Sequence, residues 1–236
     1  MMEAAIMMPN PIKVPVGGFV KMNILLWNCR GALNADFKKR VPEMVVNHQP
    51  ALMVITETRI GGDRAKRIVE GLPFDSFFAT NTIGYAGGLW LLWKKEEADF
   101  FVLSAMEQEI HASVKLCNSN ISWLISSVYD SPCIVERRIL WSNLSKVASL
   151  HSLPWLLLGD FNEILSREDK FGGRNINLNR AIEFKECINA CNLLDLGFSG
   201  PKYTWSNLRQ ILDLILERKT NALLTHLGAC YTPKLR

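Results

Sequence analysis

Short apolar runs that end in polar residues limit the folds open to this chain more than any other feature. A run of four to eight apolar residues is too short for an ordinary helix and is typical of a strand buried on both faces. The chain has 236 residues, 48% of them hydrophobic, which is enough for one domain with a substantial core. The runs are Asn23 to Asn28 (NILLWN), Ala51 to Thr56 (ALMVIT), the LWLLW that follows Gly87-Gly88, and Pro154 to Gly159 (PWLLLG).

Further strands and three helices are predicted between and after these runs. Apolar residues recur at helical spacing after Pro132 and again over 179–191, and Pro50 is expected to stop a helix over 35–47. Because strands outnumber helices and several strands are adjacent, the pattern predicts α/β layers with mixed or antiparallel sheets. The remaining predicted strands cover residues 99–104, 110–116, 121–129, 203–205 and 211–217.

Two segments are distinguished by composition. Residues 1–21 are rich in methionine and proline and do not form a convincing signal peptide, so they are expected to be a poorly ordered extension. Residues 22–236 are expected to form a single domain. No stretch reaches the ~20 apolar residues of a membrane span, so no membrane partner is expected.

The cysteines and the net charge indicate the compartment and the class of partner. The six cysteines include no CxxC pair, which favours reduced thiols in an intracellular protein, nuclear or cytoplasmic, over a secreted one. Cys187 and Cys191 lie one helical turn apart, but two small apolar residues on a helix are favoured over metal ligands. A formal net charge of +4 permits a nucleic-acid partner without requiring one. Nothing in the sequence indicates an obligate protein partner.

Polar residues follow three of the apolar runs. Asn28 ends the first run, Glu57 follows the second, and Asp160 with Asn162 follows the last. A buried strand that ends in a carboxylate or an amide can aim an oxygen ligand into a cleft. One such residue is more often a solvated loop residue. Three of them together favour a Mg²⁺ site, because Mg²⁺ uses one or two carboxylates and completes its shell with water and phosphate.

Ordered motifs in this chain resemble the endonuclease domain of plant LINE-type (non-LTR) retrotransposons. That domain belongs to the endonuclease/exonuclease/phosphatase superfamily and is related to apurinic/apyrimidinic endonucleases and pancreatic DNase. The resemblance extends from about Met22 to Leu223, and GDFNEI is its most specific part. The matching motifs are NILLWNCRG (23–31), ITET (55–58), GGLWLLW (87–93), SVY (127–129), GDFNEI (159–164), KFGG (170–173), DLGFSG (195–200) and YTWSN (203–207).

The resemblance implies a two-sheet β-sandwich flanked by helices, with DNA as the substrate. It implies that Glu57, with Asn28 nearby, holds Mg²⁺. Asp160 would orient or deprotonate the attacking water, Asn162 would hold that water or a phosphate oxygen, and Tyr129 would contact the scissile phosphate. The carboxylates of Glu57 and Asp160 are then expected to lie within roughly 12 Å of each other. Trp205 is near the family's substrate surface, although a core or rim position is favoured for it.

Two departures from the family pattern affect the expected activity. Members of the resembled family continue with Glu-Arg-Leu-Asp-Arg-Ala-Leu. At the same place this chain has Glu217-Arg218-Lys219-Thr220-Asn221-Ala222-Leu223. Thr220 therefore stands at the position of an aspartate. The family ends with a last strand and a Ser-Asp-His motif that do not follow here, and His226 is the only late histidine. We therefore expect a C-terminally truncated domain with impaired endonuclease activity.

Two alternatives to an impaired endonuclease remain at the level of sequence. The chain could be a catalytically inactive remnant that at most binds nucleic acid weakly. It could also be a phosphatase of the same superfamily, since the fold by itself does not determine the substrate.

Overall fold

Two main β-sheets and a small third sheet form the framework. The computed structural model describes residues 12–16, 20–82, 87–117, 122–197, 202–207, 209 and 213–225. The first sheet has the order β1-β2-β3-β5-β4: Ile12–Val16, Val20–Asn28, Leu52–Thr56, Leu89–Trp93 and Ser76–Ala79. The second has the order β11-β14-β9-β8-β7-β6: Leu193–Asp195, Thr220–Thr225, Trp155–Asp160, Ser122–Tyr129, Glu109–Leu116 and Ala98–Ala105. The small sheet, β10-β13-β12, pairs Lys170–Phe171, Leu216–Glu217 and Trp205–Ser206.

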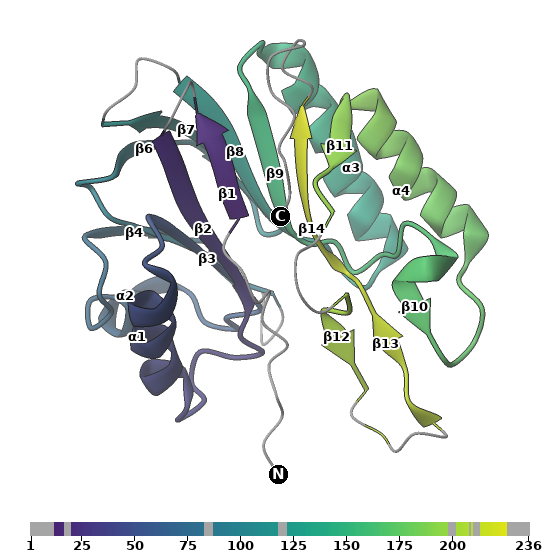
Figure 1. Ribbon diagram of the computed structural model, residues 1–236, viewed down its shortest axis with the longest axis horizontal. Coiled ribbons are helices and arrows are strands. Elements are labelled where there is room, and N and C mark those ends of the chain that lie inside the picture. The colour runs from purple at the N-terminus through teal and green to yellow at the C-terminus, as the bar shows by residue number, and fades with distance from the viewer. Residues whose placement is uncertain are drawn as a thin grey trace.

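Helices cover the outer faces of the two main sheets (Figure 1). The helices α1 (Phe37–His48) and α2 (Gly62–Val69) lie against the first sheet. The helices α3 (Ile134–Leu150) and α4 (Leu178–Ala190) pack side by side against the second. The molecule is therefore built of four layers, helix, sheet, sheet and helix. None of the described helices is long and apolar enough to cross a membrane.

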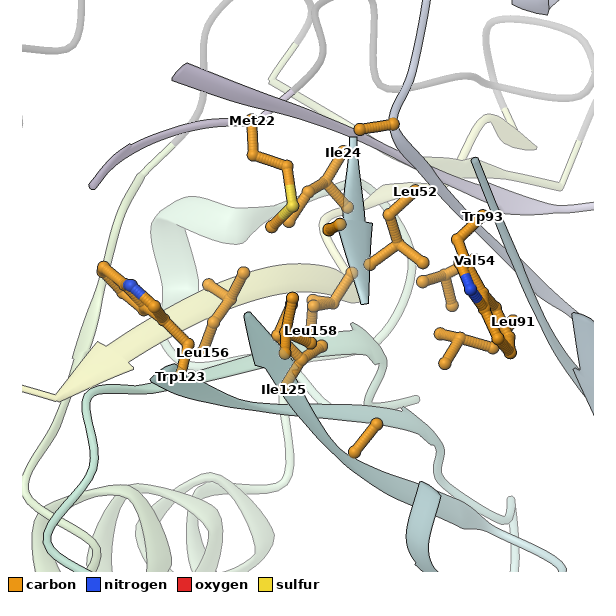
Figure 2. Packing of buried hydrophobic residues seen from close by; sticks show 14 of the residues in the cluster. Met22, Ile24, Leu52, Val54, Leu91, Trp93, Trp123, Ile125, Leu156 and Leu158 are labelled. Carbon is orange, nitrogen blue, oxygen red and sulfur yellow. The ribbon is translucent and has the colours of Figure 1, made fainter. Parts of the chain in front are cut away.

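The inner faces of the two sheets share one apolar core (Figure 2). Ile24, Leu52 and Leu91 from the first sheet meet Ile125 and Leu156 from the second, and all five side chains are almost fully buried. Side chains alternate between the faces of a strand, so every second residue of each strand contributes to this core. The intervening residues pack against the helices and form a second apolar cluster on each side.

The predicted fold class is confirmed. The strands predicted within 23–28, 51–56, 89–93, 99–104, 110–116, 121–129 and 154–159 and the helices predicted over 35–47, after Pro132 and over 179–191 are all present within one or two residues at most boundaries. Both sheets are mixed, because β2 runs parallel to β3 and β8 parallel to β9, while the other pairs are antiparallel.

The structure also contains elements that the sequence did not predict, among them the helix α2 and the strands β4, β10 and β11. The strand β1 lies inside residues 1–21 and pairs antiparallel with β2, so part of that segment extends the first sheet. The strand expected over 211–217 is limited, among the described residues, to β13 at 216–217. The strand β14 was not expected. It pairs along β9 from Thr220 opposite Asp160 to Leu224 opposite Leu156.

A buried polar cluster lies behind the ends of β8 and β9. Asp130 follows β8 and is fully buried; its Oδ2 accepts a hydrogen bond from Trp141 Nε1 of α3 at 3.3 Å. Its Oδ1 has no hydrogen-bond partner among the described residues. Glu163 accepts from Arg137 of α3 and from Arg180 of α4, which ties both helices to the loop after β9. Burial raises the pKa of Asp130 to about 8, against the opposing charge of Arg137.

Replacement of Gly159 by alanine is expected to destabilise the fold by about 3 kcal/mol or more, because β8 and β9 would have to separate. A Cβ at Gly159 would lie 1.9 Å from the carbonyl oxygen of Val128 on the neighbouring strand. Gly71→Ala is the matched control, since its Cβ would meet only Ile68 O, at an ordinary 3.5 Å. Urea unfolding measures both free energies, and equal values for the two variants would contradict the prediction.

Replacement of Asp130 by asparagine is expected to remove a pH-dependent loss of stability. Asp130 keeps its proton up to about pH 8 in the folded chain, whereas the unfolded chain releases it near the ordinary value of 3.8. Between these values the folded state binds more protons, so its stability falls as the pH rises. The free energy of unfolding of the wild type should therefore fall relative to that of Asp130→Asn, by at most about 1.4 kcal/mol per pH unit. Parallel stability curves for the two proteins between about pH 5 and pH 8 would overturn this assignment.

Candidate active site

The polar end of the inter-sheet core holds the residues that the sequence singles out. Asn28, Tyr129 and Asp160 are the last residues of β2, β8 and β9. By alternation, Asn28 lies on the face of β2 that buries Ile24 in the core, and Asp160 on the face of β9 that buries Leu156. Both parallel strand pairs end on the same side of the molecule, so polar residues from two sheets meet there.

The amide of Asn28 joins carboxylates from both sheets. Its Nδ2 donates to Oε1 of Glu57 at 3.1 Å and to Oδ2 of Asp160 at 2.8 Å. Since both oxygens lie within 3.1 Å of one nitrogen, the two carboxylates are well inside the roughly 12 Å that a shared metal, phosphate and water assembly allows. The Oδ1 of Asn28 accepts from the backbone N–H of Arg30 at 3.2 Å, which fixes the orientation of the amide.

Tyr129 and Asn162 belong to the same network. The hydroxyl of Tyr129 donates to Glu57 Oε1 at 3.3 Å. The backbone N–H of Asn162 donates to Asp160 Oδ1 at 3.0 Å, and its Nδ2 donates to the carbonyl of Asp130 at 2.8 Å. All five residues singled out from the sequence are therefore connected by hydrogen bonds at one end of the sandwich.

Unusual backbone conformations concentrate around this network. Glu57, Arg59, Arg30 and Asn162 have positive φ angles of 54°, 57°, 51° and 45°. Non-glycine residues rarely adopt this region, and strained residues of this kind cluster at functional sites. The turn at 57–59 closes on Gly88, where a Cβ would lie 2.3 Å from Thr58 Oγ1, so glycine is required there. The Gly87-Gly88 pair thus allows the chain that carries Glu57 to approach the next strand.

Burial raises the pKa of two groups in the network, Asp160 and Tyr129. Burial raises the pKa of Asp160, while the N–H of Asn162 and the amide of Asn28 oppose the shift. A carboxylate with a raised pKa is a stronger base once it is ionised. Burial, followed by the charges of Glu57 and Asp160, raises the pKa of Tyr129, so its hydroxyl stays protonated and acts as a donor.

Two cationic side chains flank the network, and the sequence analysis assigned a role to neither. Arg59 Nη2 lies 3.2 Å from Glu57 Oε2. Lys219 Nζ lies 2.9 Å from Glu217 Oε2 and 4.4 Å from the centroid of the Trp205 ring. A signal for Lys219 was present in the sequence, because a lysine stands where the family run has leucine.

The described histidines lie away from this end of the sandwich. His48 ends α1; His111 is buried between Glu109 and Ser126; His151 packs edge-on against Trp155. His226 and Cys230 lie outside the described residues. Position 220 is opposite Asp160 in the β14–β9 register, so a threonine occupies the place nearest the network on that strand. Each of the described cysteines is a free thiol, including Cys187 and Cys191.

The donor set fits a hard divalent cation. The described residues contain no group of three or more His, Cys, Asp or Glu that could hold a metal ion. Glu57 nevertheless supplies a carboxylate beside Asn28, and Mg²⁺ can use a single carboxylate when water and phosphate complete its shell. The Glu57 side chain is 17% exposed, so it is not fully shielded from solvent. The amide nitrogen of Asn28 faces the carboxylates, so its oxygen could join such a shell only after the amide turns over.

Solved structures share this fold at low sequence identity. An AP endonuclease from Leishmania major superposes with a TM-score of 0.66 at 14% identity, covering 86% of this chain and 78% of that one. The endonuclease domain of TRAS1, a telomere-specific non-LTR retrotransposon, gives 0.63 at 12% identity, covering 86% and 84%. A 3′-5′ exonuclease from Neisseria meningitidis gives 0.58 at 15% identity, covering 86% of both chains.

Sequence comparison identifies the family directly. No curated protein matches the chain. Residues 25–229 match the model of the endonuclease/exonuclease/phosphatase family, a range that includes all five residues of the network. The chain therefore belongs to the endonuclease/exonuclease/phosphatase family.

Proposed function

We propose that this protein is a Mg²⁺-dependent DNA endonuclease of the retrotransposon type with weak activity. The observation that carries the proposal is the Asn28 amide, which holds Glu57 and Asp160 together at the open end of the sandwich. The motifs GDFNEI, KFGG and YTWSN support the retrotransposon branch, and a retrotransposon endonuclease domain is among the structural neighbours.

Each residue of the network has a role in this proposal. Glu57 would hold the metal with Asn28 beside it, and a bound Mg²⁺ would neutralise charge on a phosphate oxygen. Asp160 accepts the proton of the attacking water, and its raised pKa suits it to do so. Asn162, fixed by the carbonyl of Asp130, holds that water or a phosphate oxygen. The protonated hydroxyl of Tyr129 donates to the phosphate.

The expected weak nuclease activity follows from the residues available to act together with Asp160. Thr220 stands at the position of the family's aspartate, and a hydroxyl cannot carry a negative charge at neutral pH. The described histidines are committed to other parts of the fold. Loss of one preorganised group that stabilises a transition state typically costs about 10²–10³ in rate.

A phosphatase is the second candidate. A structure of a 3′ phosphatase from Neisseria bound to product DNA hairpin superposes with a TM-score of 0.59 at 15% identity, covering 86% of each chain. Release of inorganic phosphate from 3′-phosphorylated DNA, without strand cleavage, would favour this candidate.

Nicking of supercoiled plasmid in the presence of Mg²⁺ tests the proposal. We expect slow nicking, about 10²–10³-fold below that of a family member with a complete site, and loss of nicking in Asp160→Ala. Glu183→Ala is a suitable control, because it removes an exposed carboxylate that pairs only with Arg138 in the described structure. Nicking that survives in Asp160→Ala would contradict the site. Complete inactivity at stoichiometric protein would favour the inactive remnant.

Arg59 is expected to compete with the metal for Glu57. Its guanidinium is half-exposed and lies 3.2 Å from Glu57 Oε2, so the pair is worth only about 0.5–1 kcal/mol. Arg59→Ala should therefore tighten Mn²⁺ binding about twofold to fivefold. Electron paramagnetic resonance of free Mn²⁺ measures this without DNA or turnover. Arg64→Ala removes an equal charge from the exposed face of α2 and should leave binding unchanged. Weaker Mn²⁺ binding in Arg59→Ala would show that Arg59 assists the site.

A further inference from the structure

Lys219 is held at the edge of the active site by the backbone. It directly precedes β14, and its carbonyl accepts a hydrogen bond from the N–H of Phe161 at 3.0 Å. The next residue, Thr220, lies opposite Asp160 in the strand register. The small sheet that carries Trp205 and Glu217 lies at the end of the molecule from which β14 starts (Figure 1). Lys219 thus joins the small sheet to the strand beside Asp160.

The side chain of Lys219 is preorganised and only partly exposed. Its Nζ lies 4.4 Å from the centroid of the Trp205 ring and 2.9 Å from Glu217 Oε2. Trp205 and Glu217 are paired across β12 and β13, so the ring and the carboxylate form one rigid cradle. The Lys219 side chain is 19% exposed, so it is not sealed from solvent. Because these contacts already hold the side chain, less side-chain entropy is lost when an anion binds it.

The cradle carries an excess of positive charge. Glu217 is a single carboxylate shared by two ammonium groups, since its other oxygen, Oε1, accepts from Lys170. Burial opposes the ionisation of Glu217, but the hydrogen bonds from Lys170 and Lys219 outweigh burial and lower its pKa. With the carboxylate ionised, two positive charges face one negative charge. The excess charge can therefore act on an anion bound nearby.

The charge of Lys219 reaches the catalytic carboxylate. Burial raises the pKa of Asp160, and Lys219 is among the groups that oppose this shift. Trp205 supplies an aromatic surface next to the ammonium, an arrangement that recurs where proteins bind nucleic-acid backbones and bases together.

We propose that Lys219 binds a phosphate oxygen of the DNA backbone beside Asp160, and so supplies a positive charge that the residues of the network lack. The inference rests on the proposed function and specifies a contact within it. The ligand class is a nucleic-acid phosphate. Trp205 and Glu217 act as positioning residues, because they hold the ammonium and are not themselves required to contact the phosphate.

Lys219→Met is compared with Lys115→Met to test the proposal. Each removes one ammonium, and Lys115 is an exposed residue of β7 opposite Ser122, at the end of β8 away from Tyr129. Binding of each protein to a short fluorescein-labelled DNA duplex is measured by anisotropy over a range of NaCl, with Ca²⁺ in place of Mg²⁺. Loss of one phosphate contact should lower the slope of log K against log salt by about 0.9.

The expected result is a lower slope and about three- to tenfold weaker binding for Lys219→Met, with both quantities near wild-type values for Lys115→Met. Equal slopes in the two variants would overturn the role of Lys219 and leave the proposed function standing. Failure of the wild-type protein to bind the duplex at any salt concentration would overturn the proposed function, and with it the inference.

Discussion

Face-to-face packing of two sheets on one apolar layer is the constraint from which the site follows. Ile24 and Leu156 place the inner faces of β2 and β9 against the same core. Because side chains alternate along a strand, the next inward positions at the strand ends are Asn28 and Asp160. At these ends the core gives way to solvent, so polar side chains there can be half-buried and still find partners. The hydrogen bond from Asn28 to Asp160 therefore links the two sheets at the end of their shared core.

The electrostatics of the site depend on the same burial. Burial raises the pKa of Asp160, and neutral donors from Asn28 and Asn162 oppose this shift. Two cationic groups lie at the edge of the site. Arg59 pairs with Glu57 Oε2, and the Lys219 ammonium lies over the Trp205 ring. A site with anionic groups at its centre and cations at its rim can attract both a divalent metal and a polyanion.

The structural neighbours separate what the fold contributes from what this chain contributes. At 12–15% identity they share the layered fold over most of this chain, although their names cover an AP endonuclease, a retrotransposon endonuclease and an exonuclease. The fold supplies the converging strand ends, whereas individual side chains decide the chemistry. In this chain Lys219 and Thr220 follow one another directly before and at the start of β14, next to Asp160 in the strand register.

The strands with continuous apolar runs, such as Leu89–Trp93, could be predicted from the sequence, because burial on both faces leaves a clear apolar pattern. The polar residues that follow these runs could be predicted in the same way. The sequence did not identify β14, whose polar first residues hide the strand. It predicted strands near β12 and β13, but not β10 or the pairing of these three short strands, which only tertiary contacts stabilise. The partners of Arg59, Lys219 and Asp130 were likewise decided by tertiary structure. Trp205 and Trp141 reach Lys219 and Asp130 from other segments, and Glu57 meets Arg59 within a sharp turn. No local periodicity in the sequence records which side chains a fold brings into contact.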